Sequence, residues 1–183
     1  MARVILVPGR GYARPEHWQS RWAREHPWYT TVPRDDDPHF TIALRVPALH
    51  KAVMADPEPA VLVAHSGGCV TVVQWAATHT GPVAAALLVA PPYLDPSWTP
   101  DPGDPSPDSF PPGIPLGRLP FRTVVVASRT DPYATFAQAE AYAAAWGATI
   151  VDAGDAGHID TRSGYGPWPA GERLLADLLA PLD

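Results

Sequence analysis

A serine flanked by small residues stands at the end of a short apolar run, in the segment Ala64-His65-Ser66-Gly67-Gly68. Residues 61–64 are apolar throughout, which is typical of a buried parallel strand, and residues 71–77 continue at helical spacing. A serine at the tip of a strand–turn–helix unit is the arrangement of a nucleophile elbow, whose tight turn requires small neighbours. Ala64 stands where the G-x-S-x-G pattern has its first glycine, a mild departure. The segment predicts that Ser66 is a nucleophile.

A serine hydroxyl needs a neighbouring base to attack at neutral pH, and the elbow predicts an acid and then a histidine later in the chain. Asp131 follows the β-branched run 123–127, and His158 follows the short apolar run 148–151. The carboxyl ends of parallel strands share one edge of a sheet, where α/β proteins bind their ligands. We therefore expect Ser66, Asp131 and His158 to converge as a Ser-Asp-His triad.

Each of these features also has a purely structural interpretation. A glycine-flanked serine can be a tight turn, Asp131 before a proline can cap a helix, and a Gly-His pair in a loop is usually structural. Their order along the chain, each after a predicted strand, favours the triad. The rival acids Asp152, Asp155 and Asp160 rank below Asp131 because they lie too close to His158 in the sequence.

Four stretches of the chain match a known family. They are Val7-Pro8-Gly9-Arg10-Gly11 with Glu16-His17-Trp18-Gln19, His65-Ser66-Gly67-Gly68, Ala127-Ser128-Arg129-Thr130-Asp131-Pro132-Tyr133, and Ala156-Gly157-His158-Ile159 with Ser163-Gly164-Tyr165-Gly166-Pro167-Trp168-Pro169. With them the chain resembles the compact serine-hydrolase family of the α/β-hydrolase superfamily, which contains YdeN-like bacterial proteins and the retinoblastoma-binding-protein hydrolase. The match spans nearly the whole chain, except for residues 35–38 and a proline-rich insertion.

The resemblance implies the same three roles: Ser66 as nucleophile, Asp131 as acid and His158 as base. In α/β-hydrolases the loop after the first strand supplies one backbone N–H of the oxyanion hole, and the residue after the nucleophile supplies the other. The second donor is therefore Gly67. The resemblance places the first donor at Arg10, with Gly11 as a less favoured alternative.

The elements that must position these residues alternate between apolar strands and helical segments, which predicts an α/β-hydrolase-like three-layer sandwich with a mostly parallel central sheet. We expect strands at residues 4–7, 28–32, 61–64, 83–89, 123–127 and 148–151 and helices at residues 15–25, 41–55, 71–77, 133–146 and 170–182. Pro47 is expected to kink or restart the helix that contains it. Residues 1–183 are expected to form a single domain.

Residues 91–120 differ in character from the rest of the chain, since eleven of these thirty residues are proline. Such a segment cannot be a long helix or a central strand. It leaves from the carboxyl edge of the predicted sheet, which favours a lid-like insertion over a surface excursion without a role. The candidate pocket residues are Gly11, His65, Tyr93, Trp98 and Phe110. Arg10, Arg14 and Arg129 near the same edge could recognise a substrate carboxylate.

The composition of the chain limits the classes of partner and the cellular compartment that we expect. A formal net charge of −6 argues against nucleic acid or an anionic membrane. The single cysteine, Cys69, has no internal disulfide partner, and no signal-peptide or membrane-span pattern occurs, which together favour the cytoplasm. Three consecutive aspartates at residues 35–37 cannot all face one ion, and no histidine has a metal-ligand spacing, so we expect neither metal nor cofactor.

The sequence thus predicts a serine hydrolase, carboxylesterase-like, that acts on small acyl substrates, with esters favoured over amides. Two alternatives remain. The same triad could serve an acyltransferase or cyclase if the pocket favours another acceptor over water. A non-catalytic binding module could keep the fold, although it would have no need of all three triad residues.

Overall fold

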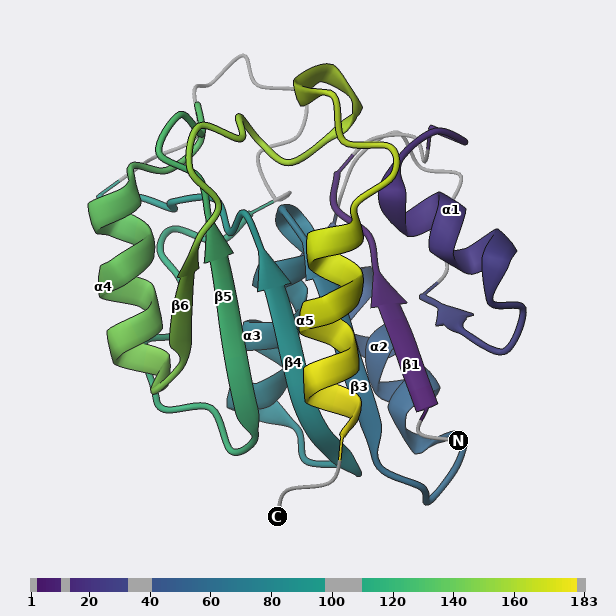
Figure 1. Cartoon of the computed structure of the whole chain (residues 1–183). Helices are drawn as coiled ribbons and strands as arrows, with labels where there is room; N and C mark the ends of the chain where they lie inside the picture. Colours follow the sequence, from purple (N-terminus) through teal and green to yellow (C-terminus); the bar gives the residue numbers. More distant parts are fainter. Residues whose placement is uncertain (1–2, 11–13, 33–40, 98–109, 181–183) are drawn as a thin grey trace.

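Six parallel strands form the centre of the protein in a computed structural model that describes residues 3–10, 14–32, 41–97 and 110–180 (Figure 1). The strand order is β2-β1-β3-β4-β5-β6. The strands are β1 (Arg3–Val7), β2 (Thr30–Thr31), β3 (Ala60–His65), β4 (Val83–Val89), β5 (Arg122–Ala127) and β6 (Thr149–Asp152). Because every pair in the sheet is parallel, the carboxyl ends of all six strands point to one edge.

Helices cover both faces of this sheet. They are α1 (Trp18–Glu25), α2 (Ile42–Met54), α3 (Gly67–Thr78), α4 (Phe136–Trp146) and α5 (Pro169–Leu179), with a short 3₁₀ helix, η1 (Thr161–Ser163), at the carboxyl edge. Helices α1 and α5 pack on one face, and α2, α3 and α4 pack on the other. The predicted three-layer α/β sandwich is confirmed. No helix in the described part of the chain is long and apolar enough to cross a membrane.

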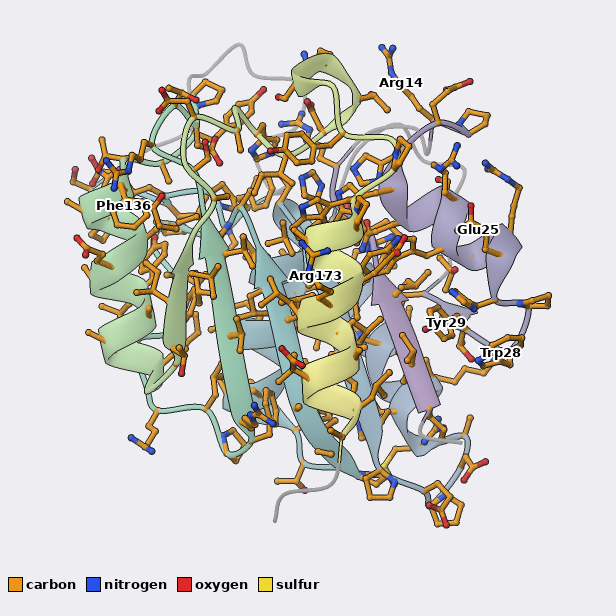
Figure 2. All side chains as sticks on the ribbon, viewed as in Figure 1. Arg14, Glu25, Trp28, Tyr29, Phe136 and Arg173 are labelled. Carbon is orange, nitrogen blue, oxygen red and sulfur yellow. The ribbon has the colours of Figure 1, made fainter. Side chains whose placement is uncertain are left out.

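The strands are apolar on both sides because both faces of the sheet are covered. In β1 the side chains of Val4 and Leu6 enter the cluster beneath α1 and α5, whereas Ile5 and Val7 enter the cluster beneath α2, α3 and α4. This alternation is the two-residue period of a strand. Side chains fill the space between the sheet and both helical layers (Figure 2).

Helix starts differ from the predictions where a side chain caps the helix. Helix α1 starts at Trp18 and not near residue 15, because the Nδ1 atom of His17 accepts a hydrogen bond from the backbone N–H of Gln19. Helix α4 starts at Phe136 because Thr135 and Gln138 form a reciprocal capping box.

Other element boundaries depend on packing and local backbone conformation. Helix α4 ends, as predicted, before Gly147, which adopts a left-handed conformation with φ of 68°. Pro47 was expected to kink or restart helix α2; the helix runs through it without a break, so of these two alternatives the restart is wrong. Strand β2 is only two residues long, much shorter than the predicted 28–32, and Trp28 lies outside it with 56% of its surface exposed.

Candidate active site

The turn between β3 and α3 holds Ser66 in a strained conformation. Ser66 has φ of 54° and ψ of −124°, a backbone conformation that residues with a side chain rarely adopt. A Cβ atom at Gly68 would collide with the carbonyl oxygen of Val7, and one at Gly9 would lie 2.8 Å from the carbonyl oxygen of His65. The loop after β1 and the turn after β3 approach each other so closely that Gly9 in the loop and Gly68 in the turn must both be glycine.

Ala64, which replaces the first glycine of the elbow pattern, lies at the end of β3. It is fully buried in the core cluster beneath α2, α3 and α4 and pairs in register with Val7 and Leu88 on the neighbouring strands. Its methyl group is thus accommodated by the core on the α3 side of the sheet.

Three side chains from different loops meet at the carboxyl edge of the sheet. The Oγ atom of Ser66 lies 2.9 Å from Nε2 of His158, and Nδ1 of His158 lies 3.0 Å from both carboxylate oxygens of Asp131. Since a carboxylate only accepts, Nδ1 carries the proton, and Nε2 accepts from the serine hydroxyl. The His158 and Asp131 side chains are only 8% and 3% exposed. The three residues singled out in the sequence are in direct contact.

The rival aspartates have other partners or positions. Asp152 forms an ion pair with Arg129, and its carboxylate oxygen lies 2.8 Å from Nε of that residue. Asp160 accepts hydrogen bonds from the backbone N–H and hydroxyl of Ser163. Asp155 is exposed. The carboxylate that contacts the ring of His158 is that of Asp131.

The loop that follows β1, around Pro8, lies beside the Ser66 turn. The buried side chain of Arg45, on α2, donates a hydrogen bond to the carbonyl oxygen of Pro8 and so fixes the loop that continues to Gly9 and Arg10. Gly67 is the first residue of α3, where backbone N–H groups have no partner within the helix. Gly11, the alternative donor, lies outside the described residues. Arg45 could not be singled out from the sequence, because there it looks like one more polar residue of an amphipathic helix.

Comparison with known proteins is consistent with this geometry. The sequence profile of the serine hydrolase family matches residues 4–177. The chain belongs to the serine hydrolase family. A search of the curated proteins finds no match for this serine hydrolase.

Solved structures show the same fold. A YdeN-like hydrolase from Pectobacterium atrosepticum is 29% identical, with a TM-score of 0.83 over 97% of this chain and 90% of that one. The ydeN gene product of B. subtilis is 17% identical, with a TM-score of 0.75 over 99% of this chain and all of that one. An α/β-superfamily hydrolase from Xanthomonas campestris is 20% identical, with a TM-score of 0.62 over 98% of both chains.

Hydroxyl side chains hold the loop that carries His158 in this hydrolase. The buried hydroxyl of Ser128 accepts from the N–H of Ala156 at 2.9 Å and lies 3.2 Å from the carbonyl oxygen of Gly154. Thr130 accepts from the N–H of Gly157 at 3.0 Å. Sequence reasoning gave these residues no role, although their position between β5 and Asp131 is a signal that could have identified them.

Ser163 continues this support on the other side of His158. Its Oγ atom accepts from the backbone N–H of His158 at 3.0 Å and donates to Asp160 at 2.9 Å. A Cβ atom at Gly157, where φ is 55°, would lie 2.9 Å or less from the Ser163 side chain. The His158 loop is therefore fixed from two sides.

His65, at the end of β3, joins the two loops. Its Nε2–H donates to the backbone carbonyl oxygen of His158 at 2.9 Å, and its ring lies 4.8 Å from that of His17 and 5.0 Å from that of His158. Burial, with smaller contributions from His17 and His158, holds the pKa of His65 well below its ordinary value. His65 is therefore neutral in the folded protein.

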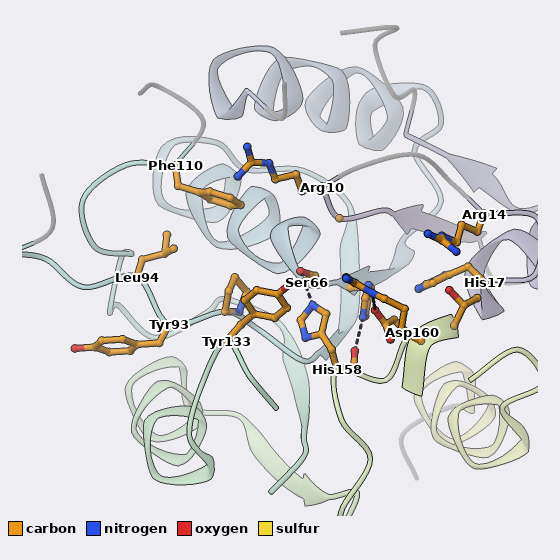
Figure 3. A pocket seen from close by; sticks show the side chains of 15 residues that line it. Arg10, Arg14, His17, Ser66, Tyr93, Leu94, Phe110, Tyr133, His158 and Asp160 are labelled. Carbon is orange, nitrogen blue, oxygen red and sulfur yellow. Dashed lines mark hydrogen bonds and ion pairs between the residues drawn. The ribbon is translucent and has the colours of Figure 1, made fainter. Parts of the chain in front are cut away.

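A cavity of about 590 Å³ opens over Ser66 and His158 (Figure 3). Three of the predicted pocket residues, His65, Tyr93 and Phe110, line it, whereas Trp98 and Gly11 lie outside the described residues. Arg10 and Arg14 also line it, but Arg129 does not, because it pairs with Asp152. The remaining lining residues are Gly9, His17, Pro92, Leu94, Tyr133, Asp160, Thr161 and Arg162.

Neither a reactive thiol nor a metal cluster accompanies Ser66 in the described regions. Cys69 is fully buried, and burial raises the pKa of its thiol well above the ordinary value, so it stays protonated. Among the described residues, no three His, Cys, Asp or Glu side chains are grouped so that they could hold a metal ion.

Proposed function

We propose that this serine hydrolase cleaves small carboxylic esters through an acyl-enzyme on Ser66. The contact that carries the proposal is the continuous chain from Ser66 Oγ to His158 Nε2, at 2.9 Å, and from His158 Nδ1 to Asp131, at 3.0 Å. A nucleophile, a base and an orienting acid within hydrogen-bond reach are the requirements for nucleophilic catalysis by serine.

The first step acylates the enzyme. Ser66 Oγ attacks the ester carbonyl carbon while His158 Nε2 takes the hydroxyl proton. Asp131 accepts the hydrogen bond from Nδ1–H, which keeps Nε2 available as the base and stabilises the imidazolium that forms. His158 then returns the proton to the leaving alkoxide, and the C–O bond to the alcohol breaks.

Backbone donors stabilise the negative oxygen of each tetrahedral intermediate. We assign this role to the backbone N–H groups of Gly67 and Arg10. The close approach of the loop to the nucleophile supports the assignment, because a Cβ atom placed on Gly9 would lie 2.9 Å from the Cβ atom of Ser66. Water activated by His158 then attacks the acyl-enzyme, which releases the acid and frees Ser66.

Esters are favoured because an alkoxide leaves more readily than an amine. The pocket walls also suit small acyl groups, because two aromatic side chains can contact an apolar acyl chain. These are Tyr93 and Phe110, from the described ends of the 91–120 insertion. The insertion is anchored beside the site, because the N–H of Tyr93 donates to the carbonyl oxygen of Tyr133 and the N–H of Leu94 donates to the hydroxyl of Tyr142. We propose that the insertion determines which acyl groups enter.

The test is burst kinetics with p-nitrophenyl esters of increasing chain length on the wild type and on Ser66→Ala. We expect a burst of one nitrophenolate per protein, and a loss of kcat of about 10⁴-fold or more in the variant, because the attacking atom is gone. A fluorophosphonate should label the wild type at Ser66 and leave Ser66→Ala unlabelled.

Other results would redirect the assignment. Labelling without hydrolysis would indicate an acceptor other than water, as in an acyltransferase or cyclase. Absence of both labelling and turnover would contradict the hydrolytic proposal and favour a binding module. Thr78→Ala, which removes an exposed hydroxyl near the end of α3, is the matched control and should retain turnover and labelling.

A further inference from the structure

The cavity has two sides of different chemistry, with the reacting atoms between them. Tyr93, Leu94 and Phe110 lie on one side of Ser66, with Arg10 beside Phe110, whereas Arg14 and His17 lie on the other (Figure 3). A substrate whose scissile bond lies at Ser66 therefore places one end among the aromatic and aliphatic side chains and the other end beside Arg14.

The charge of the cavity is opposite to that of the whole protein. Among the described residues, its lining includes three arginines (Arg10, Arg14 and Arg162) against one aspartate (Asp160), a formal charge of +2, whereas the chain as a whole carries −6. Positive charge gathered in a cleft of an acidic protein attracts anionic ligands. General composition does not explain it, because the chain has only 13 lysines and arginines against 19 aspartates and glutamates.

Asp160 offsets one of these positive charges. Its Oδ1 accepts from the N–H and hydroxyl of Ser163, and its Oδ2 forms an ion pair with Arg162, at 3.3 Å from Nε. The Arg162 side chain lines the cavity and remains 71% exposed, so the ion pair leaves most of this side chain accessible to a ligand.

Arg14 lies at the carboxyl edge of the sheet, just before α1 (Figure 2). It lines the same cavity beside His17, whose ring is positioned by its contacts with Trp18 and His65. Arg14 and Arg162 line the same cavity, and a guanidinium group can bind a carboxylate through paired N–H donors.

We propose that the substrates are esters with an apolar group on one side of the scissile bond and a carboxylate on the other, and that Arg14 and Arg162 bind the carboxylate. The proposal deepens the hydrolase function and rests on it. A cavity of about 590 Å³ has the size of sites that take small molecules, so both groups fit together with the ester.

The test compares esters that differ in one charge. Mono-p-nitrophenyl adipate and p-nitrophenyl hexanoate differ by a carboxylate on the acyl chain, and 4-carboxyphenyl and 4-carbamoylphenyl butyrate differ by a carboxylate on the alcohol. At low salt, in one of the two pairs, kcat/KM for the anionic ester should exceed that for its neutral twin by about tenfold or more. Arg14→Gln and Arg162→Gln should each lower that ratio by about tenfold.

Arg129→Gln is the matched control, because this arginine lies outside the cavity in an ion pair with Asp152, and it should keep the wild-type ratio. Ratios near one for both pairs, or ratios that survive the loss of Arg14 and Arg162, would overturn the proposal while leaving the hydrolase intact.

If no ester is hydrolysed, the proposed function fails separately, and the carboxylate site is decided by binding. Calorimetry of monomethyl adipate with Ser66→Ala should then show binding that Arg14→Gln abolishes. No binding to Ser66→Ala, or equal binding after Arg14→Gln, would contradict the site.

Discussion

The two loops that bring the reacting side chains together are held in different ways. The turn around Ser66 is held by the backbone, through a positive φ and through glycines that let β1 and its loop approach closely. The loop around His158 is held by side chains, since hydroxyl groups of Ser128, Thr130 and Ser163 satisfy its backbone N–H groups. The Ser66 turn is thus fixed by backbone packing against β1, and the His158 loop is fixed by side-chain hydrogen bonds.

This difference predicts different consequences of substitution. A change that fills space at the Ser66 turn pushes the first turn of α3 away from the end of the central strand β1, so the penalty falls on folding. A change that removes a hydroxyl from the His158 loop leaves the sheet intact but loosens the base relative to Ser66, so the penalty falls more on activity.

The largest effect should come from Gly68→Ala. The added methyl group meets the carbonyl oxygen of Val7, a backbone atom of the central strand β1 that cannot move aside. We expect the free energy of unfolding to fall by about 3 kcal/mol, measured by urea unfolding followed by circular dichroism. Gly117→Ala is the control, because no heavy atom lies within 4 Å of its Cβ position. Equal unfolding midpoints for both variants would contradict the backbone account.

A smaller effect on stability, with a clear effect on rate, should follow from Ser128→Ala. The buried N–H of Ala156 loses its acceptor, which costs about 1–3 kcal/mol, and the loop two residues before His158 loses an anchor. We expect kcat for a p-nitrophenyl ester to fall by about tenfold, with a smaller change in KM. Thr78→Ala, which removes an exposed hydroxyl from α3, should leave kcat unchanged. An unchanged kcat in Ser128→Ala would show that the hydroxyl serves stability alone.

The same contrast explains how much the sequence could reveal. The Ser66 turn was predicted because its requirements are local, as an apolar strand, small neighbours and a helix follow one another within about a dozen residues. Asp131 and His158 were found because parallel strands deliver their carboxyl ends to one edge. The sheet itself follows from apolar runs that are buried on both faces.

The supporting contacts were missed because they are not local. Nothing near Arg45 in the sequence indicates that its guanidinium reaches the carbonyl oxygen of Pro8, 37 residues away. The Ser128 hydroxyl likewise finds its N–H donor 28 residues later. Helix α1 was predicted to start too early because proline at the first turn is a common signal, whereas the cap formed by His17 is not.

The smallest effect at neutral pH concerns His65, which joins the two loops by donating to the carbonyl oxygen of His158. Its pKa is held well below the ordinary value near 6.5, chiefly by burial and then by His17 and His158, while Asp160 opposes this weakly. In acid the unfolded chain therefore binds a proton at this residue and the folded protein does not. Stability should fall as the pH drops below about 6.5, by about 1.4 kcal/mol per pH unit for this group.

His65→Gln removes this titration and keeps an N–H donor for the His158 carbonyl group, so it should flatten the decline of stability as the pH falls below about 6.5. The lowered pKa of Asp160 acts in a separate window, since its contribution is lost only as the pH falls below about 3.8. The measurement is the urea midpoint against pH for the wild type, His65→Gln and the control His79→Gln, which lies at the other end of α3. If the urea midpoints of His65→Gln and of the wild type fell in parallel with pH, His65 would bind a proton in the folded protein as it does in the unfolded chain. Burial would then not keep this histidine neutral.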